Sequence, residues 1–451
     1  MAGYYLKDDR VVSEGEAVPV VWSGDVIVAG GGPGGLGSAI AANRNGLRTI
    51  LIEQLGFLGG MCSFGCGMPL GGAHPAYISN GGIAQEILDM TQNVGEDSAD
   101  IRVMGQFSYW YFHDSEYFKS MIAQFVLKEK LNVRLHTMVS QVVMLSGSRA
   151  AGVIVESKSG RQAMLAKTIV DCTGDADICA LAGARYEKGR DADGAMMATT
   201  VVFNAGGVDT EKFFAYKQTD PTFEAALEKA RQNGDFVHPD DKLVNICPGL
   251  RTGTLFCNTV RVRDIDGTNV EDLTKAELEA RVRILQQMNF FRQYLPGCEK
   301  AFIAGAGSQL GVRDTRRIVG EEYLSTEDNL AQRKRDTGIL RCAGPLDNSS
   351  RGSDSKHAAL NTIDENDWFD IPYGALVPKG LDNIIVAGRS FSSSYLAQSG
   401  ARGMGLLIGM GECAGTAAYF AVRDNVAFRE VDVKDLQKKL MEQGNFLGNK
   451  L

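Results

Sequence analysis

Short apolar runs that end in glycine clusters set the pattern of this chain. From Asp25 to Glu53 an apolar run, a glycine cluster, an alanine-rich stretch and a second apolar run follow one another. Apolar runs of this length predict buried strands, and the alanine-rich stretch between them predicts a helix. The pattern returns at 381–419, with an apolar run, a glycine turn and a long stretch of small residues. Strand, turn, helix and strand in this order predict an α/β fold with a parallel sheet.

Other stretches have the spacing of single elements. Residues 114–131 repeat apolar positions at helical spacing and begin with Asp114 and Ser115, either of which can cap a helix. Residues 133–143 and 152–156 alternate in the way that predicts strands. We therefore expect a helix followed by two strands in this part of the chain.

A change in loop length and in helix charge in the middle of the chain predicts a second domain. From about residue 185 to 370 loops are longer and helices are charged, as in the predicted helix 271–291, and 341–366 is polar. We expect a Rossmann-like dinucleotide-binding domain, discontinuous in sequence, with an inserted α+β substrate domain. The predicted boundaries are an N-terminal extension 1–21, a dinucleotide domain 22–185 and 371–425, a substrate or cap domain 186–370, and a C-terminal tail 426–451.

Charge and composition narrow the function. The net charge is −8 and no basic run occurs, so neither nucleic acid nor a membrane is expected as a partner. The N-terminus lacks a signal-peptide pattern, and nine cysteines without regular spacing suit a reducing compartment, so a cytoplasmic location is expected. The apolar stretch 404–422 contains Glu412 and several glycines, which predicts a buried helix and not a membrane span. No metal site is expected.

The first glycine cluster matches the G-x-G-x-x-G pattern of dinucleotide-binding turns. Gly30 makes the tight turn, Gly32 lets the backbone approach a pyrophosphate, and Gly35 lets helix and strand pack closely. Glu53 ends the second apolar run, where a carboxylate accepts hydrogen bonds from a ribose. With a strand before it and a helix after it, this turn predicts a dinucleotide site.

Four blocks of the chain together resemble a known family. They are the glycine turn with Glu53, the pair Gly59 and Gly60, the stretch 169–177, and the stretch 383–391. In this order they resemble FAD-dependent oxidoreductases with the glutathione-reductase type of two-dinucleotide fold. That group includes fumarate-reductase-like and thiazole-synthase-like flavoproteins. Only one G-x-G-x-x-G occurs, so a separate domain for a nicotinamide cofactor is not expected.

The resemblance implies FAD as the cofactor and assigns residues to it. The backbone near Val139 would contact the adenine, and Thr173 and Gly174 would pass near the cofactor. Gly388 and Arg389 would reach the pyrophosphate and ribityl end, although the family often has Asp where this chain has Arg389. The helix after Gly400 begins with free backbone donors that would stabilise a reduced flavin. The remaining expected cofactor residues are Met61, Cys62, Arg402, Gly403 and Met404.

Cys62 and Cys66 follow the glycine pair and allow several interpretations. Disulfide reductases of this fold have two cysteines after the pair and a histidine relay near the C-terminus, but no histidine follows His357 here. A redox pair, a metal site and covalent attachment of flavin at Cys62 are therefore less favoured. The preferred interpretation is a glycine-rich backbone cradle with two cysteines as small packing residues.

The chemistry is expected from arginines and a histidine. Arg313 or Arg316 could hold a carboxylate or polarise a carbonyl at the flavin, and His113, or less favourably His74, could move a proton. Pairing of the arginines with nearby acids on a solvated face is the alternative. We expect two-electron hydride transfer between flavin N5 and a small polar substrate. A thiol–disulfide oxidoreductase and an electron-transfer subunit are the alternatives. The sequence does not identify the electron acceptor or donor, and it is compatible with a homo-oligomer.

Overall fold

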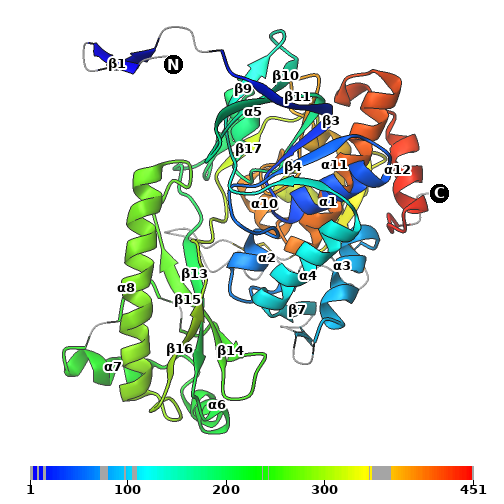
Figure 1. Cartoon of the computed structure of the whole chain (residues 1–451). Coiled ribbons are helices and arrows are strands. Elements are labelled where there is room, and N and C mark those ends of the chain that lie inside the picture. The colour runs from blue at the N-terminus through cyan, green and yellow to red at the C-terminus, as the bar shows by residue number, and fades with distance from the viewer. Residues whose placement is uncertain are drawn as a thin grey trace.

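One sheet carries the parallel core of the protein. In Figure 1 this sheet lies near the top of the molecule, next to helix α1 (Pro33–Arg44). Its strands run side by side in the order β8, β4, β3, β11 and β20, all parallel, so the chain order reverses next to β3. The bounds are β3 Val20–Ala29, β4 Thr49–Ile52, β8 Asn132–Arg134, β11 Gly160–Asp171 and β20 Ile384–Val386. The computed structural model describes residues 4–7, 10–13, 17–71, 80–95, 98–103, 109–235, 237–241, 243–344, 346–347 and 367–448.

The first half of β11 belongs to an antiparallel meander. It pairs with β10 (Ala150–Ser157), which pairs with β9 (Met138–Met144). The prediction of a single strand over 133–143 is wrong, because β8 and β9 lie at opposite edges of the sheet. The chain breaks at His136, whose φ of 50° is left-handed, and the Thr137 N–H then bonds the Glu53 carbonyl at 3.0 Å. Alternation alone could not reveal this break.

Two helices pack on the parallel sheet and on each other. They are α1 (Pro33–Arg44) and α11 (Met404–Asp424). A Cβ at Gly37 would lie 2.0 Å from the Ile408 carbonyl oxygen, so only glycine allows this approach. α11 is long and apolar enough to cross a membrane, but 89% of its apolar window is buried inside the protein. It is therefore a core helix, as its sequence predicts. Nearby lie α3 (Gly82–Gln92), α4 (Ser115–Lys128) and α12 (Val433–Glu442) (Figure 1).

A second sheet forms its own core. Its antiparallel strands run in the order β14, β15, β13 and β16, and the long helix α8 (Val270–Tyr294) lies along it (Figure 1). This core draws its buried residues from Val201 to Leu310. Its other elements are β13 Thr199–Gly206, α6 Thr210–Thr219, α7 Glu224–Gln232, β14 Ile246–Pro248, β15 Leu255–Val262 and β16 Phe302–Ala306.

After β16 the chain returns to the first core. Ile318, Leu340 and Phe369 are buried there. They lie in β17 (Arg316–Ile318), which pairs with β12 (Tyr186–Lys188), and in the pair β18 (Gly338–Cys342) and β19 (Phe369–Pro372). The segment between β16 and β17 therefore joins the two cores, and residues 311–315 lie between them.

Candidate active site

A cavity of about 570 Å³ lies where the parallel strands end. Its wall includes the turns after β3, β4, β11 and β20, and residues of β13, α8 and the joining segment 309–313. In open α/β sheets, ligands bind at the carboxyl ends of the strands where the strand order reverses. The position of the cavity fits that rule, and residues of both cores line it.

The glycine turn after β3 forms one end of the cavity. Gly30 has a φ of 102°, and a Cβ there would lie 2.3 Å from the Cys172 carbonyl oxygen. A Cβ at Gly35 would lie 1.8 Å from the Gly30 carbonyl oxygen, so α1 starts tightly against the turn. At Gly32 the nearest atom is 4.0 Å away, and Gly32 lines the cavity. The turn thus exposes bare backbone at the N-terminus of α1, which suits a pyrophosphate.

Glu53 lines the cavity beside this turn. Its carboxylate accepts the Gly31 N–H at 2.6 Å and the Leu55 N–H at 2.8 Å. Burial raises the pKa of this carboxyl above its ordinary value. Glu53 therefore ties the end of β4 to the glycine turn and keeps acceptor lone pairs for ribose hydroxyls.

The second glycine pair splits between the cavity and the interior. Gly60 and Met61, which begins α2 (Met61–Phe64), line the cavity. Gly59 faces inward, because its N–H bonds the Gly31 carbonyl at 2.7 Å and a Cβ there would lie 2.3 Å from Ser63 Oγ. Cys62 is buried, with its Sγ 3.4 Å from Met404 Sδ.

The cysteines of this loop are free thiols in apolar surroundings. All nine cysteines of the chain are unpaired. Burial raises the pKa of Cys62, and it raises the pKa of Cys66 to about 11. A reactive thiolate needs a lowered pKa, so these surroundings work against one. Among the described residues no group of His, Cys, Asp and Glu could hold a metal ion.

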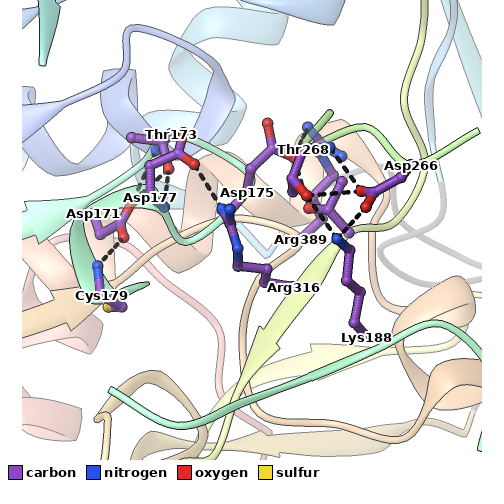
Figure 2. Close-up of polar contacts among 11 residues, drawn as sticks. Asp171, Thr173, Asp175, Asp177, Cys179, Lys188, Asp266, Thr268, Arg316 and Arg389 are labelled. Carbon is purple, nitrogen blue, oxygen red and sulfur yellow. Dashed lines mark hydrogen bonds and ion pairs between the residues drawn. The ribbon is translucent and has the colours of Figure 1, made fainter. Parts of the chain in front are cut away.

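A polar network surrounds the turn after β11 (Figure 2). Thr173 and Gly174 line the cavity, and the Arg389 side chain lies over Gly174. Arg389 Nη2 pairs with Asp175 Oδ1 at 2.9 Å, and that oxygen also accepts the Thr315 hydroxyl at 2.7 Å. Arg389 therefore reaches the cavity already joined to a carboxylate. Gly388, before it, also lines the cavity.

The start of α11 also forms part of the cavity wall. Arg402, Gly403 and Met404 line it, and no side chain caps the helix at Gly403. The first N–H groups of an uncapped helix can bind a polar ligand and carry the positive end of the helix dipole. Val139, at the start of β9, lines the cavity near Glu53.

The three candidate catalytic side chains differ in their position relative to the cavity. Arg313 lines the cavity, is 8% exposed, and donates from Nη1 to the Ala198 carbonyl at 2.7 Å. Arg316 is not in the lining, and its Nη1 bonds Asp177 Oδ1 at 2.7 Å (Figure 2). His113 is also absent from the lining. It is buried, its Nε2 lies 2.7 Å from the Cys62 carbonyl, and burial lowers its pKa. His74 lies outside the described residues.

Three residues at or behind the cavity have no local sequence signal. Arg261 comes from β15 and Asp347 from the polar segment after β18. Gln398, in α10 (Tyr395–Gly400), donates from Nε2 to the carbonyls of Arg313 at 3.1 Å and of Arg389 at 3.2 Å. The polar composition of 341–366 was the one sequence feature that pointed toward Asp347. The three residues come together only through contacts between segments distant in sequence.

Comparison with known proteins identifies the family of this chain. The family described as FAD dependent oxidoreductase matches residues 25–440. Leghemoglobin reductase of Vigna unguiculata is 56% identical over 43 residues, and dihydrolipoyl dehydrogenase 1, mitochondrial, of Arabidopsis thaliana is 54% identical over 43 residues. Each match covers 9% of this chain and 8% of the relative, so the chain spans a small part of either.

Among solved structures, p-nitrophenol 4-monooxygenase PnpA of Pseudomonas putida DLL-E4 is 13% identical, with 94% of this chain and 87% of that chain covered and a TM-score of 0.49. The family match spans nearly the whole chain, and the backbone cradle and Glu53 suit a dinucleotide. This chain belongs to the FAD dependent oxidoreductase family and is an enzyme that uses FAD.

Proposed function

We propose that this protein transfers a hydride between flavin N5 and a small polar substrate, by dehydrogenation or by reduction of a double bond. FAD, when bound, supplies the two-electron centre. Arg313 holds and orients the substrate, because a guanidinium binds oxyanions in a fork and does not titrate at neutral pH. The observation that carries the proposal is that Arg313 and the dinucleotide cradle line one cavity.

The surroundings of Arg313 favour a positioning and charge-stabilising role. Its Nη1 is fixed by the Ala198 carbonyl, and its own carbonyl is held by Gln398. Burial lowers the pKa of this guanidinium, but an arginine remains charged near neutral pH. A fixed charge in a buried wall stabilises developing negative charge more strongly than one in water.

The two alternatives have less support. A thiol–disulfide oxidoreductase needs a thiolate, and burial raises the pKa of both Cys62 and Cys66. An electron-transfer subunit needs no built substrate pocket, whereas this cavity has an arginine in its wall beyond the cofactor cradle. His113 as the proton-transfer residue stays a prediction, and its burial away from the cavity lining does not favour it.

The test is anaerobic mixing of the FAD-loaded enzyme with small hydroxy acids, amino acids and amines, followed by the flavin spectrum. A substrate should bleach the flavin, and deuterium at its oxidised carbon should slow bleaching. Enoic acids should reoxidise the reduced enzyme. The variant Arg313→Gln should slow the step by about ten- to a thousandfold, in line with loss of a charge-stabilising donor, while Arg316→Gln should have a small effect.

Two outcomes would contradict the proposal. One is flavin that reacts only with a protein partner or a dithiol and with no small substrate. The other is an isotope-sensitive step that Arg313→Gln leaves unchanged. The first would favour one of the alternatives, and the second would remove Arg313 from the reaction.

A further inference from the structure

Three arginines from separate parts of the chain lie near Asp347, a carboxylate of the cavity wall. We name Arg261, Arg313 and Arg402 the arginine cluster. Arg313 and Arg402 line the cavity, together with Asp347. Arg402 Nη2 pairs with Asp347 Oδ2 at 2.6 Å, and the Asp347 N–H donates to Ser399 Oγ at 2.8 Å.

The backbone explains how Arg261 and Arg313 reach the same place. Thr200 of β13, which lines the cavity, is directly opposite Arg261 of β15. Side chains directly opposite in an antiparallel pair lie on the same face of the sheet. On its other side Thr200 exchanges two backbone hydrogen bonds with Gly311, at 3.1 and 2.7 Å, which brings Arg313 beside β13. The two arginines therefore flank one end of β13.

The cluster carries more positive charge than its surroundings balance. Asp347 is the acidic residue that the cluster shares, because burial would raise its pKa but these guanidiniums lower it. Asp314 accepts the Met197 N–H at 2.7 Å, and burial raises its pKa, although the charge of Arg402 acts in the opposite direction. Glu277, also in the cavity wall, accepts the Leu310 N–H at 2.5 Å and pairs with Arg281 at 3.3 Å. Among the described residues, Asp347 is the carboxylate that faces all three cations, whereas Asp314 faces Arg313 and Arg402.

Two donors of the cluster, one on Arg261 and one on Arg402, also lack acceptors among the described residues. Arg261 Nε and Arg402 Nε are buried and have no hydrogen-bond partner in the described part of the chain. A buried charged donor without an acceptor is costly, and such groups are paired or bind ligands. A ligand carboxylate offers two acceptor oxygens in the planar geometry that guanidinium matches.

We propose that the arginine cluster is a subsite for the carboxylates of an acid substrate, and that Asp347 is an internal carboxylate that competes for it. The inference rests on the proposed function, because it names the substrate class of that same cavity. It adds Arg261 and Asp347, to which the family resemblance assigns no role. The carboxylates of a dicarboxylic acid would offset the positive charge and supply acceptors for Arg261 Nε and Arg402 Nε.

The test is binding to the FAD-loaded, oxidised protein, without turnover. Glutarate, butyrate and neutral butyramide are the probes, and the flavin spectrum and the melting temperature are the readouts. Glutarate should bind more tightly than butyrate, and butyramide should not bind. Arg261→Gln should weaken glutarate about ten- to a hundredfold, as expected for a lost charged hydrogen-bond partner.

Asp347→Asn supplies the sharper test, because its expected effect has the opposite sign. Removing the competing carboxylate should tighten glutarate several-fold, whereas a merely structural Asp347 would leave affinity unchanged or reduce it. Arg251→Gln is the matched control, since Arg251 is exposed and pairs with Asp114 at 2.6 Å. If Arg261→Gln fails to fold, the glutarate affinities of Arg261→Lys and Asp347→Asn test the inference in its place.

Equal affinities for glutarate and butyramide, or no response to Asp347→Asn, would overturn the inference. These results are independent of hydride transfer. Glutarate binding with the expected variant effects, but no flavin reduction by any small substrate, would refute the proposed function and leave the subsite standing. Flavin reduction by neutral substrates, without carboxylate binding, would do the reverse.

Discussion

Gly32 and Gly35 lie in the same turn, but a methyl group would meet different surroundings at each. At Gly35 it would collide with the Gly30 carbonyl oxygen, 1.8 Å away. At Gly32 the nearest atom is Gly60 Cα at 4.0 Å, and the φ of −71° suits alanine. The open space beside Gly32 belongs to the cavity, where the backbone must approach a ligand closely.

This difference predicts opposite behaviour of two alanine variants. Gly32→Ala should leave the stability of the apoprotein nearly unchanged and lower FAD affinity by more than about tenfold. Gly35→Ala should cost about 1–3 kcal/mol or more of folding free energy through overpacking, and lose FAD as well. Thermal melts of the apoproteins and titration of FAD fluorescence measure both effects. Tight FAD binding by Gly32→Ala would contradict the placement of the pyrophosphate at this turn.

Glu412 is a buried carboxyl on α11 that is not part of the cavity lining. Its Oε2 accepts the Ile83 N–H at 2.9 Å at the start of α3, and burial raises its pKa to about 7 from an ordinary 4.5. Between these two pH values the carboxyl is protonated in the folded chain and ionised in the unfolded chain. The free energy of unfolding therefore decreases as the pH rises through this window.

Glu412→Gln should remove that dependence, because an amide does not titrate, and its oxygen can still accept the Ile83 N–H. From pH 5 to pH 8 the wild type should lose on the order of 3 kcal/mol relative to the variant. Urea unfolding at both pH values measures the difference. Parallel pH profiles for the two proteins would show that Glu412 does not titrate in this range.

At the scale of elements, helices with local signals were predictable and long-range pairings were not. The helix expected over 114–131 is confirmed as α4, and Asp114 caps it by accepting the N–H groups of Glu116 at 2.9 Å and Tyr117 at 3.1 Å. The expected helix 271–291 is confirmed within α8. The strand over 133–143 failed because the left-handed turn at His136 sends its two halves to opposite edges.

The short helix α10 makes one testable contribution through Gln398. Its amide holds the carbonyls of Arg313 and Arg389, which come from segments distant in sequence. Gln398→Met keeps the length but removes both donors, so it should cost about 1–3 kcal/mol for each buried carbonyl left without a partner. Urea unfolding measures this cost.

The same variant should weaken glutarate binding, because Arg313 would lose its anchor. Gln232→Met is the matched control, since Gln232 is exposed on α7. A Gln398→Met protein with unchanged stability and unchanged affinity would contradict the positioning role of Gln398.

At the scale of the whole molecule, polar contacts join the two cores. The Ser308 N–H bonds the Phe64 carbonyl at 3.0 Å, and Asn204 Nδ2 bonds the Cys66 carbonyl at 3.3 Å. Arg102 Nη2 bonds the Gly249 carbonyl at 3.0 Å. Loss of either core would therefore remove part of the cavity wall.

We predict that both cores unfold in one transition. Trp22 belongs to the first core and Trp368 lies outside the second, so the fluorescence of these two tryptophans reports the rest of the chain. Circular dichroism reports helices of both cores, including α8. The two melting curves should coincide, and FAD at about 100 times its Kd should stabilise both by about 2.7 kcal/mol. Separate transitions, with FAD shifting only one, would contradict this coupling.

Several of the expected cofactor residues lie in local turns that have a sequence pattern of their own. The glycine turn, Glu53, the turn at Thr173 and the start of α11 all line the cavity. Gly35, Gly59 and Cys62 lie behind the lining, where they allow close packing. Arg261 and Asp347 carry no pattern of their own, because β-strand register and chain return bring them together.

The most direct measurement is an anaerobic dithionite titration of the purified protein, with FAD counted after denaturation. The account predicts one FAD per chain and complete bleaching at two electrons per FAD, without a long-wavelength thiolate–flavin band. Absence of FAD would contradict the assignment of the cavity. Uptake of four electrons, with such a band at the halfway point, would make Cys62 and Cys66 the redox centre and contradict the cradle described for this loop.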